Sequence, residues 1–412
     1  MEHLKEAVGL VELSDYEDYM GAEAIERIAK KAEPLQGATV CHVNSTYYGG
    51  GVAELMTSLS LLMSDVGLQA DWRIIRGNPD FFDVTKGIHN ALQGGEFAWT
   101  DLKKQVYEGV NFENSLRMQL DTDFVVIHDP QPLPILEFHG RRNNPWFWRC
   151  HIDLTEPHRE TWNYMKPFVE SYDAMIVSLE QYKQDIDKPE LLFTPSIDPF
   201  KLKNRHLTEK EIDERLALYD IPTDVPIVTQ ISRFDRWKDP IGVIEAFQKI
   251  RKEQDCTLVL LGNVATDDPE GEEVFEEVSS HADDQIFIIS QHDEALVNAL
   301  QSRSAVVFQK SLREGFGLTV TEAMWKGTPV VGGNVGGIRH QIDDGENGFL
   351  VSSVDEAAER TIELLEDDEL RERMGTAAKE TVRTNFLMPH LLENYLELFN
   401  SVEGRFDVTM TQ

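Results

Sequence analysis

Short runs of aliphatic and β-branched residues alternate with helical patterns along most of the chain, and this alternation restricts the possible folds most strongly. Strands that alternate with helices in this way are typical of parallel α/β sheets. The runs form two series: 39–43, 70–75, 124–128, 146–152 and 174–177, and then 227–231, 257–261, 286–289, 305–309, 328–332 and 348–351. We therefore predict an α/β protein with two doubly wound, Rossmann-like halves.

Helical patterns separate these runs and also predict where the halves end. They cover 52–66, 102–120, 241–252, 272–281, 294–302, 320–326 and 354–365. Two prolines and small polar residues interrupt the periodicity at 194–199, which places the boundary there. We predict a first domain at 1–195 with a helical N-terminal preface, a second at 196–386 that starts with a helix at 208–218, and a helix (389–402) with a tail at 387–412.

Length and charge narrow the class of protein further. A chain of 412 residues exceeds one ordinary core, which favours two domains. The formal net charge of −34 disfavours nucleic acids and anionic membranes as partners. The three cysteines have no Cys-x-x-Cys spacing and favour neither a disulfide framework nor a zinc site. Because no secretion signal or membrane-spanning run is visible, we expect a soluble cytoplasmic protein.

A glycine-rich segment at 313–323, Arg-Glu-Gly-Phe-Gly-Leu-Thr-Val-Thr-Glu-Ala, follows a predicted strand and opens a helix near Thr319. Glycines let the backbone approach a ligand, and a helix N-terminus offers N–H groups to a phosphate. Glu314 precedes the helix and Glu322 lies in its first turns, so one carboxylate can reach sugar hydroxyls and the other a ribose. An isolated pair could equally be a surface charge and a partner of the helix dipole. The glycines between them favour a ligand site.

A second motif at 231–240 leaves the first strand of the second half and enters the next helix. Arg233 and Lys238 come from this one loop and can converge on a diphosphate through charge-assisted hydrogen bonds. Arg236 is a third cation, which we expect to be exposed. Solvated loop cations are the alternative interpretation. The two motifs support each other, because both lie at the carboxyl ends of strands in one predicted sheet.

The first half carries a glycine loop and two histidines at strand ends. The loop at 42–54 contains three consecutive glycines but lacks the Gly-x-Gly-x-x-Gly spacing of a dinucleotide site, and a simple tight turn is its alternative. His128 and His151 each stand where a predicted strand leaves the sheet. We interpret His128 as a sugar contact, whereas His151, with Asp153 beside it, stays open between a structural role and a sugar contact.

The Asp-x-Asp sequence at Asp121 and Asp123 precedes a strand rather than following one, so we interpret it as a turn and not as a metal site. The sequence also contains no P-loop, Gly-x-Ser-x-Gly elbow or His-Glu-x-x-His motif. Phosphate-loop, serine-hydrolase and zinc-protease chemistries are therefore not indicated.

A glycine loop, a strand-end histidine, an Arg-x4-Lys and a Glu-x7-Glu together resemble glycosyltransferase family 4, whose members are retaining enzymes of the GT-B fold. The resemblance implies that Arg233 and Lys238 hold the diphosphate of a nucleotide-sugar donor. It further implies that Glu314 binds hydroxyls of the donor sugar and Glu322 the ribose. Backbone amides of Gly317, Leu318 and Thr319 would bind the phosphates.

The same resemblance extends over 39–386 and assigns roles to the first half as well. Gly50 and Gly51 would approach the diphosphate, and His128 would meet the sugar near the reaction centre. The two domains would face a cleft, with the first on the acceptor side, the second on the donor side and the helix of 387–412 crossing back to the first. A homodimer is also implied.

A narrower likeness, carried by 42–54, 128–134, 148–158 and 232–240, is to the glycosyltransferring trehalose synthases. It implies reversible transfer of glucose from a nucleoside-diphosphate glucose to free glucose, giving trehalose, with His151 and Asp153 as acceptor contacts. The catalytic set would be His128, Arg233, Lys238 and Glu314, and no metal or other cofactor would be needed because the cations neutralise the leaving diphosphate. The sequence offers no clear nucleophile beside the anomeric carbon. This favours attack of the acceptor hydroxyl from the face that the diphosphate leaves, with retention of the α configuration.

Four alternatives remain open at this point. The first is phosphorolysis of trehalose, because the same sequence segments occur in the larger retaining trehalose phosphorylases. A different sugar or sugar-phosphate acceptor would need a further basic pocket in the first half, where Arg141 and Arg142 are the evident candidates. A sugar-nucleotide 2-epimerase shares the fold, although the Glu-x7-Glu motif argues against it. A non-catalytic binding module would not need the full set of donor-site residues.

Overall fold

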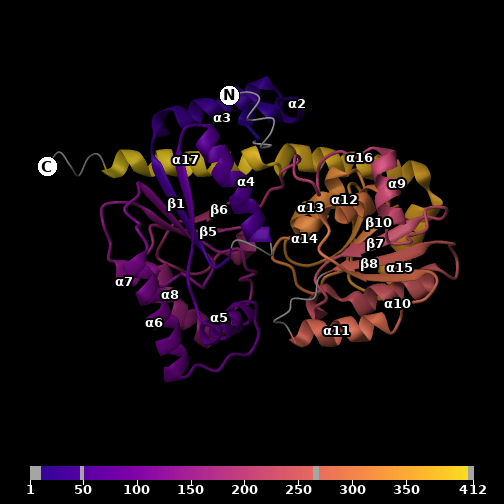
Figure 1. Ribbon diagram of the computed structural model, residues 1–412, viewed down its shortest axis with the longest axis horizontal. Coiled ribbons are helices and arrows are strands. Elements are labelled where there is room, and N and C mark those ends of the chain that lie inside the picture. The colour runs from indigo at the N-terminus through magenta and orange to yellow at the C-terminus, as the bar shows by residue number, and fades with distance from the viewer. Residues whose placement is uncertain (1–10, 47–50, 263–268, 407–412) are drawn as a thin grey trace. The chain divides into compact units, whose positions relative to one another are not determined.

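The computed structural model describes residues 11–46, 51–262 and 269–406 and separates into two compact units (Figure 1). Unit 1 comprises Met1–Ser196 together with Met388–Gln412, and unit 2 comprises Ile197–Leu387. Each unit contains one six-stranded parallel sheet. The prediction of two doubly wound α/β halves is therefore confirmed.

The sheet of unit 1 has the order β2-β1-β3-β4-β5-β6. Its strands are β1 (Thr39–Asn44), β2 (Gln69–Ile74), β3 (Phe124–His128), β4 (Trp146–Arg149), β5 (Ala174–Val177) and β6 (Glu190–Leu192). Five of them match predicted runs. Four of the five, β1, β3, β4 and β5, are central strands, which read as continuous apolar segments because both of their faces are buried. The edge strand β6 was not predicted, since it has only three residues and a glutamate among them.

The predicted strand at 146–152 is too long, because β4 ends at Arg149. The neighbouring strand β3 ends just before Asp129, which adopts the left-handed conformation with φ of 62°. Asp129 N–H still donates to the Arg149 carbonyl (2.8 Å), and the Asp129 carboxylate accepts from the His151 N–H (2.8 Å). A turn held by a side chain thus replaces the last part of the expected strand.

The helices of unit 1 are α2 (Glu17–Met20), α3 (Ala22–Ala32), α4 (Gly51–Asp65), α5 (Pro79–Leu92), α6 (Asp101–Arg117), α7 (Ile135–His139), α8 (Arg159–Val169) and α17 (Met388–Phe406). Helices α5, α7 and α8 were not among the predicted helices. The start of α5 nevertheless has a local signal, because Asn78 accepts from the Phe81 N–H (2.9 Å) and proline occupies the first position.

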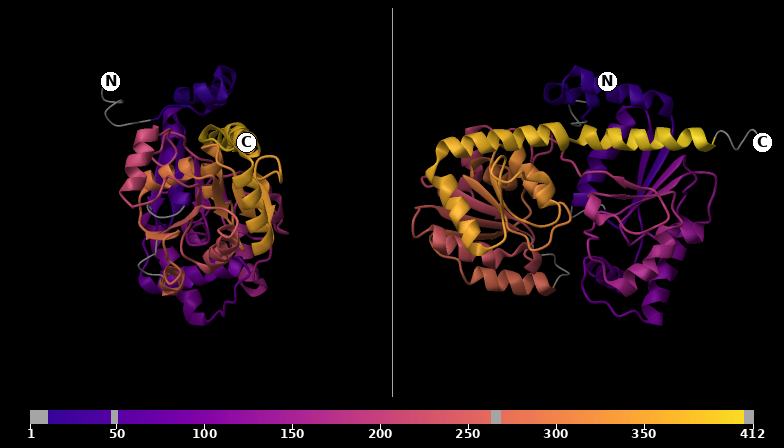
Figure 2. Two further views of the ribbon diagram at one scale, coloured as in Figure 1. Left: turned by 90° about the vertical axis from the view of Figure 1, so that its right-hand side faces the viewer. Right: turned by 180° about the vertical axis from the view of Figure 1, so that it is seen from behind.

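Helices α5, α6 and α8 cover one face of the sheet of unit 1, where a core forms around Ile127, Trp146 and Trp148. On the opposite face Phe399 of α17 stacks on Phe124, with 4.3 Å between ring centroids. Helices α3 and α4 pack against α17 (Figures 1 and 2). Helix α17, from the end of the chain, therefore covers one face of a sheet whose strands come from the first half of the sequence.

The sheet of unit 2 has the order β12-β11-β10-β7-β8-β9. Its strands are β7 (Ile227–Ile231), β8 (Thr257–Gly262), β9 (Ile286–Ser290), β10 (Val306–Gln309), β11 (Val330–Gly333) and β12 (Phe349–Val351). Its helices are α9 (Glu209–Ala217), α10 (Pro240–Ile250), α11 (Pro269–Ser279), α12 (Glu294–Arg303), α13 (Leu318–Trp325), α14 (Ile338–Gln341), α15 (Val354–Glu366) and α16 (Asp368–Asn385). The predicted strands all occur here within two residues, whereas α14 and α16 were not predicted.

Both units place the carboxyl ends of their strands at one edge of a parallel sheet, where ligands of such folds bind. In the described part of the chain, no helix has the length and apolar character that crossing a membrane would require.

Candidate active site

Two of the predicted donor residues meet in unit 2. The Lys238 ammonium contacts the Glu314 carboxylate, and their side chains are only 16% and 11% exposed. Glu314 Oε2 also accepts from Gln309 Nε2 (3.3 Å) and Ser311 Oγ (3.3 Å). The Arg-x4-Lys and Glu-x7-Glu motifs, which leave two neighbouring parallel strands, β7 and β10, therefore build one polar cluster.

The backbone around Lys238 is fixed from several sides. Asp235 accepts from the Lys238 N–H (3.1 Å), and Gln230 Nε2 donates to the Lys238 carbonyl (3.1 Å). Asp239, left-handed with φ of 50°, caps α10 by accepting from the Gly242 N–H (3.2 Å). These contacts hold the loop so that the lysine side chain points at Glu314.

Lys310 is a residue of this cluster that the sequence analysis missed. Its side chain is 9% exposed and forms an ion pair with Asp239. A buried cation needs a partner, because an unpaired charge in a low-dielectric site is strongly unfavourable. The sequence does contain a signal for it, because Lys310 directly follows the strand β10 and therefore lies at the carboxyl end of a strand. Residues at such positions are usually exposed, so its burial was not predicted.

Arg233, the second residue predicted to bind the diphosphate, has different surroundings from Lys238. Its side chain is 67% exposed, and its guanidinium contacts Asp235 Oδ2 at 3.1 Å. Much of the Arg233 charge is thus accessible to water, whereas Lys238 is largely removed from water against Glu314.

The glycine loop before α13 is held close to its neighbours. Gly317 has φ of 86°, a conformation that favours glycine, and α13 begins at the next residue, Leu318. Gln341 Nε2 donates to the Phe316 carbonyl (2.6 Å). A Cβ at Gly337 would lie 2.3 Å from Phe316 Cα, so the two segments touch backbone to backbone. The N-terminal N–H groups of α13, including that of Thr319, are thereby fixed in position.

Glu322 is buried in α13, with only 3% of the residue exposed. Its carboxylate pairs with Lys203 Nζ (2.5 Å) and accepts from Gln301 Nε2 (3.3 Å). Burial by itself would raise the pKa of Glu322, but the charges of Lys203 and Lys326 hold that pKa below the ordinary value. The predicted ribose ligand is therefore an ionised carboxylate with a lysine partner, Lys203, that the sequence analysis did not identify.

Three histidines form a hydrogen-bonded line in unit 1. His42 Nδ1 lies 2.9 Å from His128 Nε2, and His128 Nδ1 lies 3.0 Å from His151 Nε2. His42 and His128 are fully buried, whereas His151 is half-buried. Both ring nitrogens of His128 are thus occupied, and His151 forms the exposed end of the line. His42 was not identified as a site residue, because it lies within a strand rather than at its end.

All three rings are held neutral. Burial lowers the pKa of His42 to about 4, and the pKa values of His128 and His151 also lie well below the ordinary value, chiefly because of burial. In a neutral line each shared proton belongs to one ring, so the tautomer of His128 depends on those of its two neighbours. The line therefore fixes the orientation of His128.

Two aspartates flank this line. Burial raises the pKa of Asp129 to about 6, while its hydrogen bond from the His151 N–H and the charge of Arg149 oppose the shift. Asp153 accepts from the Thr155 N–H (2.9 Å) and hydroxyl (2.6 Å), which closes a short turn after His151. The structure therefore gives Asp153 a turn-forming contact beside the histidines.

The structure describes one of the two predicted phosphate-binding glycines of the first half. Gly51 is the first residue of α4, and Gly50 lies outside the described residues. Asp123 of the Asp-x-Asp sequence accepts from the Thr39 N–H and hydroxyl, both at 2.7 Å, and Asp121 pairs with Arg142. These contacts agree with the interpretation of that sequence as a turn.

Two family models match the chain, one in each half. Residues 42–184 match the trehalose synthase N-terminal domain, and residues 212–381 match the glycosyl transferases group 1. A trehalose synthase from Pyrococcus horikoshii is 45% identical over 96% of this chain and 98% of its own length. A trehalose synthase from Rubrobacter xylanophilus is 40% identical over 95% of this chain and 97% of its own length.

The chain belongs to the trehalose synthase family. A trehalose phosphorylase from Grifola frondosa is more distant, at 26% identity over 90% of this chain and 58% of its own length. Family membership confirms the resemblance inferred from the motifs and makes the chain a glycosyltransferase.

Solved structures confirm the GT-B fold class. A sucrose-phosphate synthase from Thermosynechococcus elongatus superposes with a TM-score of 0.69 at 19% identity, covering 89% of this chain and 100% of that one. A UDP-forming trehalose-phosphate synthase from Burkholderia xenovorans gives a TM-score of 0.71 at 13% identity, covering 88% and 100%. At these identities the likeness concerns the fold alone.

Proposed function

We propose that this chain is a retaining glycosyltransferase that forms trehalose from a nucleoside-diphosphate glucose and free glucose, in a reversible reaction. The observation that carries the proposal is the desolvated Lys238–Glu314 pair in the segment that matches the glycosyl transferases. Relatives named trehalose synthase, at 45% and 40% identity over nearly the whole chain, support the choice of product.

The proposed donor site uses the charges of unit 2. Lys238 and the exposed Arg233 neutralise the departing diphosphate, an electrostatic contribution of several kcal/mol at the transition state. Glu314, already oriented by Lys238, accepts hydrogen bonds from the donor sugar, and Glu322 does so from the ribose. The N–H groups at the start of α13 bind the phosphates. Since these groups supply the neutralising charge, we propose that the reaction requires no metal ion.

The acceptor hydroxyl attacks from the face that the diphosphate leaves, and a donor phosphate oxygen takes its proton, so that the α configuration is kept. His128, which is held by His42 and His151, is the proposed sugar contact near the reaction centre. His151 and Asp153 are the proposed acceptor contacts. We also propose a cytoplasmic homodimer, as the family resemblance implies.

Product analysis by proton NMR tests this function. The protein is incubated with glucose and, in turn, with UDP-, ADP- and GDP-glucose without added metal. We expect an α,α-linked anomeric signal together with release of the nucleoside diphosphate, and the rates rank the three donors. Donor hydrolysis without disaccharide would show that the proposed acceptor is wrong while the donor site is right.

The phosphorylase alternative is tested in the same way. Trehalose and inorganic phosphate are supplied without nucleotide, and glucose 1-phosphate is measured. We expect none, because the phosphorylase relatives are more distant and match over only 58% of their length. Formation of glucose 1-phosphate at a rate comparable to nucleotide-dependent synthesis would contradict the proposal.

A further inference from the structure

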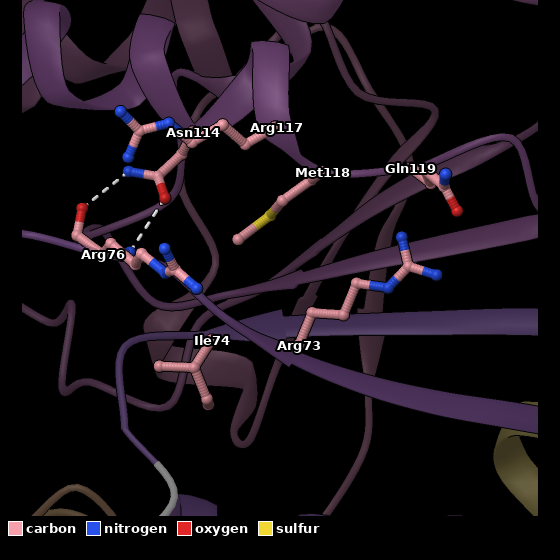
Figure 3. A pocket seen from close by; sticks show the side chains of 7 residues that line it. All are labelled: Arg73, Ile74, Arg76, Asn114, Arg117, Met118 and Gln119. Atoms are coloured by element: carbon pink, nitrogen blue, oxygen red, sulfur yellow. Dashed lines mark hydrogen bonds between the residues drawn. The ribbon is translucent and has the colours of Figure 1, made fainter.

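Unit 1 contains a basic pocket that none of the predicted site residues lines. The pocket has a volume of about 500 Å³ and is lined by Arg73, Ile74, Arg76, Asn114, Arg117, Met118 and Gln119 (Figure 3). Three arginines thus border one pocket in a chain with 39 basic and 73 acidic residues. Such a local concentration of cations against the overall charge indicates an anionic ligand.

The three arginines differ in their partners. Arg73 Nε lies 2.6 Å from Asp71 Oδ2, and Arg117 Nη2 lies 3.6 Å from Oε2 of Glu113, one turn earlier in α6. Arg76, an exposed residue, has no ion pair in the part of the chain that the structure describes. Its charge is therefore available to a ligand. The Arg73 guanidinium is oriented by its hydrogen bond to Asp71, whereas the exposed Arg117 makes only a long contact with Glu113.

Hydrogen bonds of a buried side chain hold the segments that line the pocket. Asn114 of α6 is 3% exposed and binds the backbone of Arg76 twice, accepting from its N–H (2.8 Å) and donating to its carbonyl (2.8 Å). Figure 3 shows both bonds. They tie the segment after β2 to the end of α6, so the fold sets the backbone positions from which the Arg76 and Arg117 side chains extend.

The pocket is separate from the histidine line. Arg73 pairs in register with Val43, which belongs to the core under α5 and α6, whereas His42 pairs with Trp72. Since neighbouring residues along a strand point to opposite faces of a sheet, Arg73 and His42 lie on different faces. The other basic candidates, Arg141 and Arg142, are each paired with an aspartate, Asp173 and Asp121.

We propose that this pocket binds the phosphate group of a small phosphorylated metabolite. Guanidinium groups bind phosphate through two parallel hydrogen bonds, and a pocket of this volume falls within the range of about 300–1,000 Å³ that holds small molecules. A nucleic acid would need a basic stripe instead of one pocket in an acidic molecule. The inference is independent of the proposed transfer reaction, because it concerns binding alone.

The test is calorimetric titration of the full-length protein with glucose 6-phosphate and, separately, with inorganic phosphate. We expect binding that weakens about tenfold in Arg76→Gln, the loss of one charge-assisted contact, and that is unchanged in Arg142→Gln. Arg142→Gln is the matched control, since it removes the same charge from an exposed site of the same unit. Arg76 is held through its backbone, so Arg76→Gln should keep the wild-type melting temperature.

Three outcomes would overturn the proposal. The wild-type protein binds neither probe, or Arg76→Gln binds as tightly as wild type, or binding is lost in Arg233→Ala while it persists in Arg76→Gln, which would place the anion at the predicted donor site. Binding of both probes would show that phosphate alone is recognised, and binding of glucose 6-phosphate alone would show that the sugar contributes. Both results, with the loss in Arg76→Gln, support the pocket.

Discussion

Lys238 and Glu314 stand 76 positions apart in the chain and meet in one desolvated ion pair. Each charge lies in a site where water no longer solvates it fully, so each depends on the other. Removing one partner of such a pair is more damaging than replacing both by apolar groups, because the remaining charge is left uncompensated.

Lys238→Ala should therefore destabilise the protein by about 2–4 kcal/mol, and the double variant Lys238→Met with Glu314→Leu should be less destabilised. Urea unfolding of both variants measures the difference. Donor turnover should fall by at least about a hundredfold in either, since the phosphate charge is no longer neutralised. Equal destabilisation by the single and double changes would contradict the account of the pair.

Asp129 offers a second prediction at this scale. Its pKa is about 6 in the folded protein and near the ordinary value of about 4 when unfolded. The folded state therefore holds the proton more tightly, and the stabilising contribution is present below pH 4 and lost as pH rises through 6. Asp129→Asn, whose amide oxygen can still accept from the His151 N–H, should raise the free energy of unfolding by roughly 1–3 kcal/mol at pH 7.5.

At pH 4 the same substitution should change stability much less, because the wild-type carboxyl is then protonated in the folded state and already about half protonated in the unfolded state. Asparagine also tolerates the left-handed backbone at this position. Urea unfolding at the two pH values measures both differences. A stabilisation of the same size at both pH values would mean that the titration of Asp129 is not its cause.

The histidine line predicts a pH dependence of stability opposite to that of Asp129. The pKa of His42 lies near 4 in the folded state and near 6.5 when unfolded, so its contribution is fully present above pH 6.5 and is lost as pH falls towards 4. His42→Leu removes the titration and should flatten the fall of unfolding free energy over this window. His42→Asn should do the same while keeping a hydrogen-bonding group near the position of Nδ1.

Kinetic measurements on the same two variants distinguish a positioning role of His42 from a purely structural role. If His42 orients His128, His42→Leu should lower kcat with little effect on KM for the donor, and His42→Asn should recover part of kcat. Steady-state kinetics with the preferred donor measures this split. Equal kcat in the leucine and asparagine variants would leave His42 with a packing role only.

At the scale of elements, two glycines inside helices differ in what surrounds them. A Cβ at Gly375 of α16 would lie 2.0 Å from the carbonyl oxygen of Gly327, just beyond α13. A Cβ at Gly109 of α6 would meet nothing within 4 Å. The first glycine permits close packing of two segments, whereas the second has no such reason and only weakens its helix.

Gly375→Ala should accordingly lower the free energy of unfolding by about 1–3 kcal/mol, because α16 must move away from α13. Gly109→Ala should raise it by about 0.5–1 kcal/mol through helix propensity alone. Thermal and urea unfolding of the pair measure both signs. Equal effects of the two substitutions would show that the contact at Gly327 adjusts freely.

At the scale of the whole molecule, the chain leaves unit 1 at Ser196 and returns to it at Met388. The returning helix α17 places Phe399 on Phe124, and its Glu393 pairs with Arg27 (2.8 Å) of α3. The fold of unit 1 therefore depends on residues almost 200 positions beyond the rest of its sequence.

Phe399→Ala should destabilise unit 1 by about 3–5 kcal/mol, since the ring is fully buried. Hydrogen exchange should show faster exchange in β3 and β4 and unchanged exchange in β7 and β10. Glu397→Ala is the control on the same helix, because Glu397 is 58% exposed and its pair with Lys31 is worth under about 1 kcal/mol. Loss of protection in β7 and β10 as well would show that the two units unfold together.

The amino-acid sequence by itself determined the two parallel sheets and most of their strands. β5 and β7 have the predicted bounds, because a strand buried on both faces is a local pattern of consecutive apolar residues. The same local patterns placed Lys238 and Glu314 between a strand and a helix, and Glu322 in the helix that follows. Conformation at such junctions depends on glycine, proline and caps within a few residues, which the sequence displays directly.

Only the tertiary structure decided which of these residues touch. His42 meets His128 because β1 and β3 are neighbours in the sheet, and Lys203 meets Glu322 across 119 positions of sequence. The arginine pocket likewise joins the end of β2 to the end of α6. The physical reason is that strand order and helix packing are set by burial of the whole core, which brings together side chains that no local pattern connects.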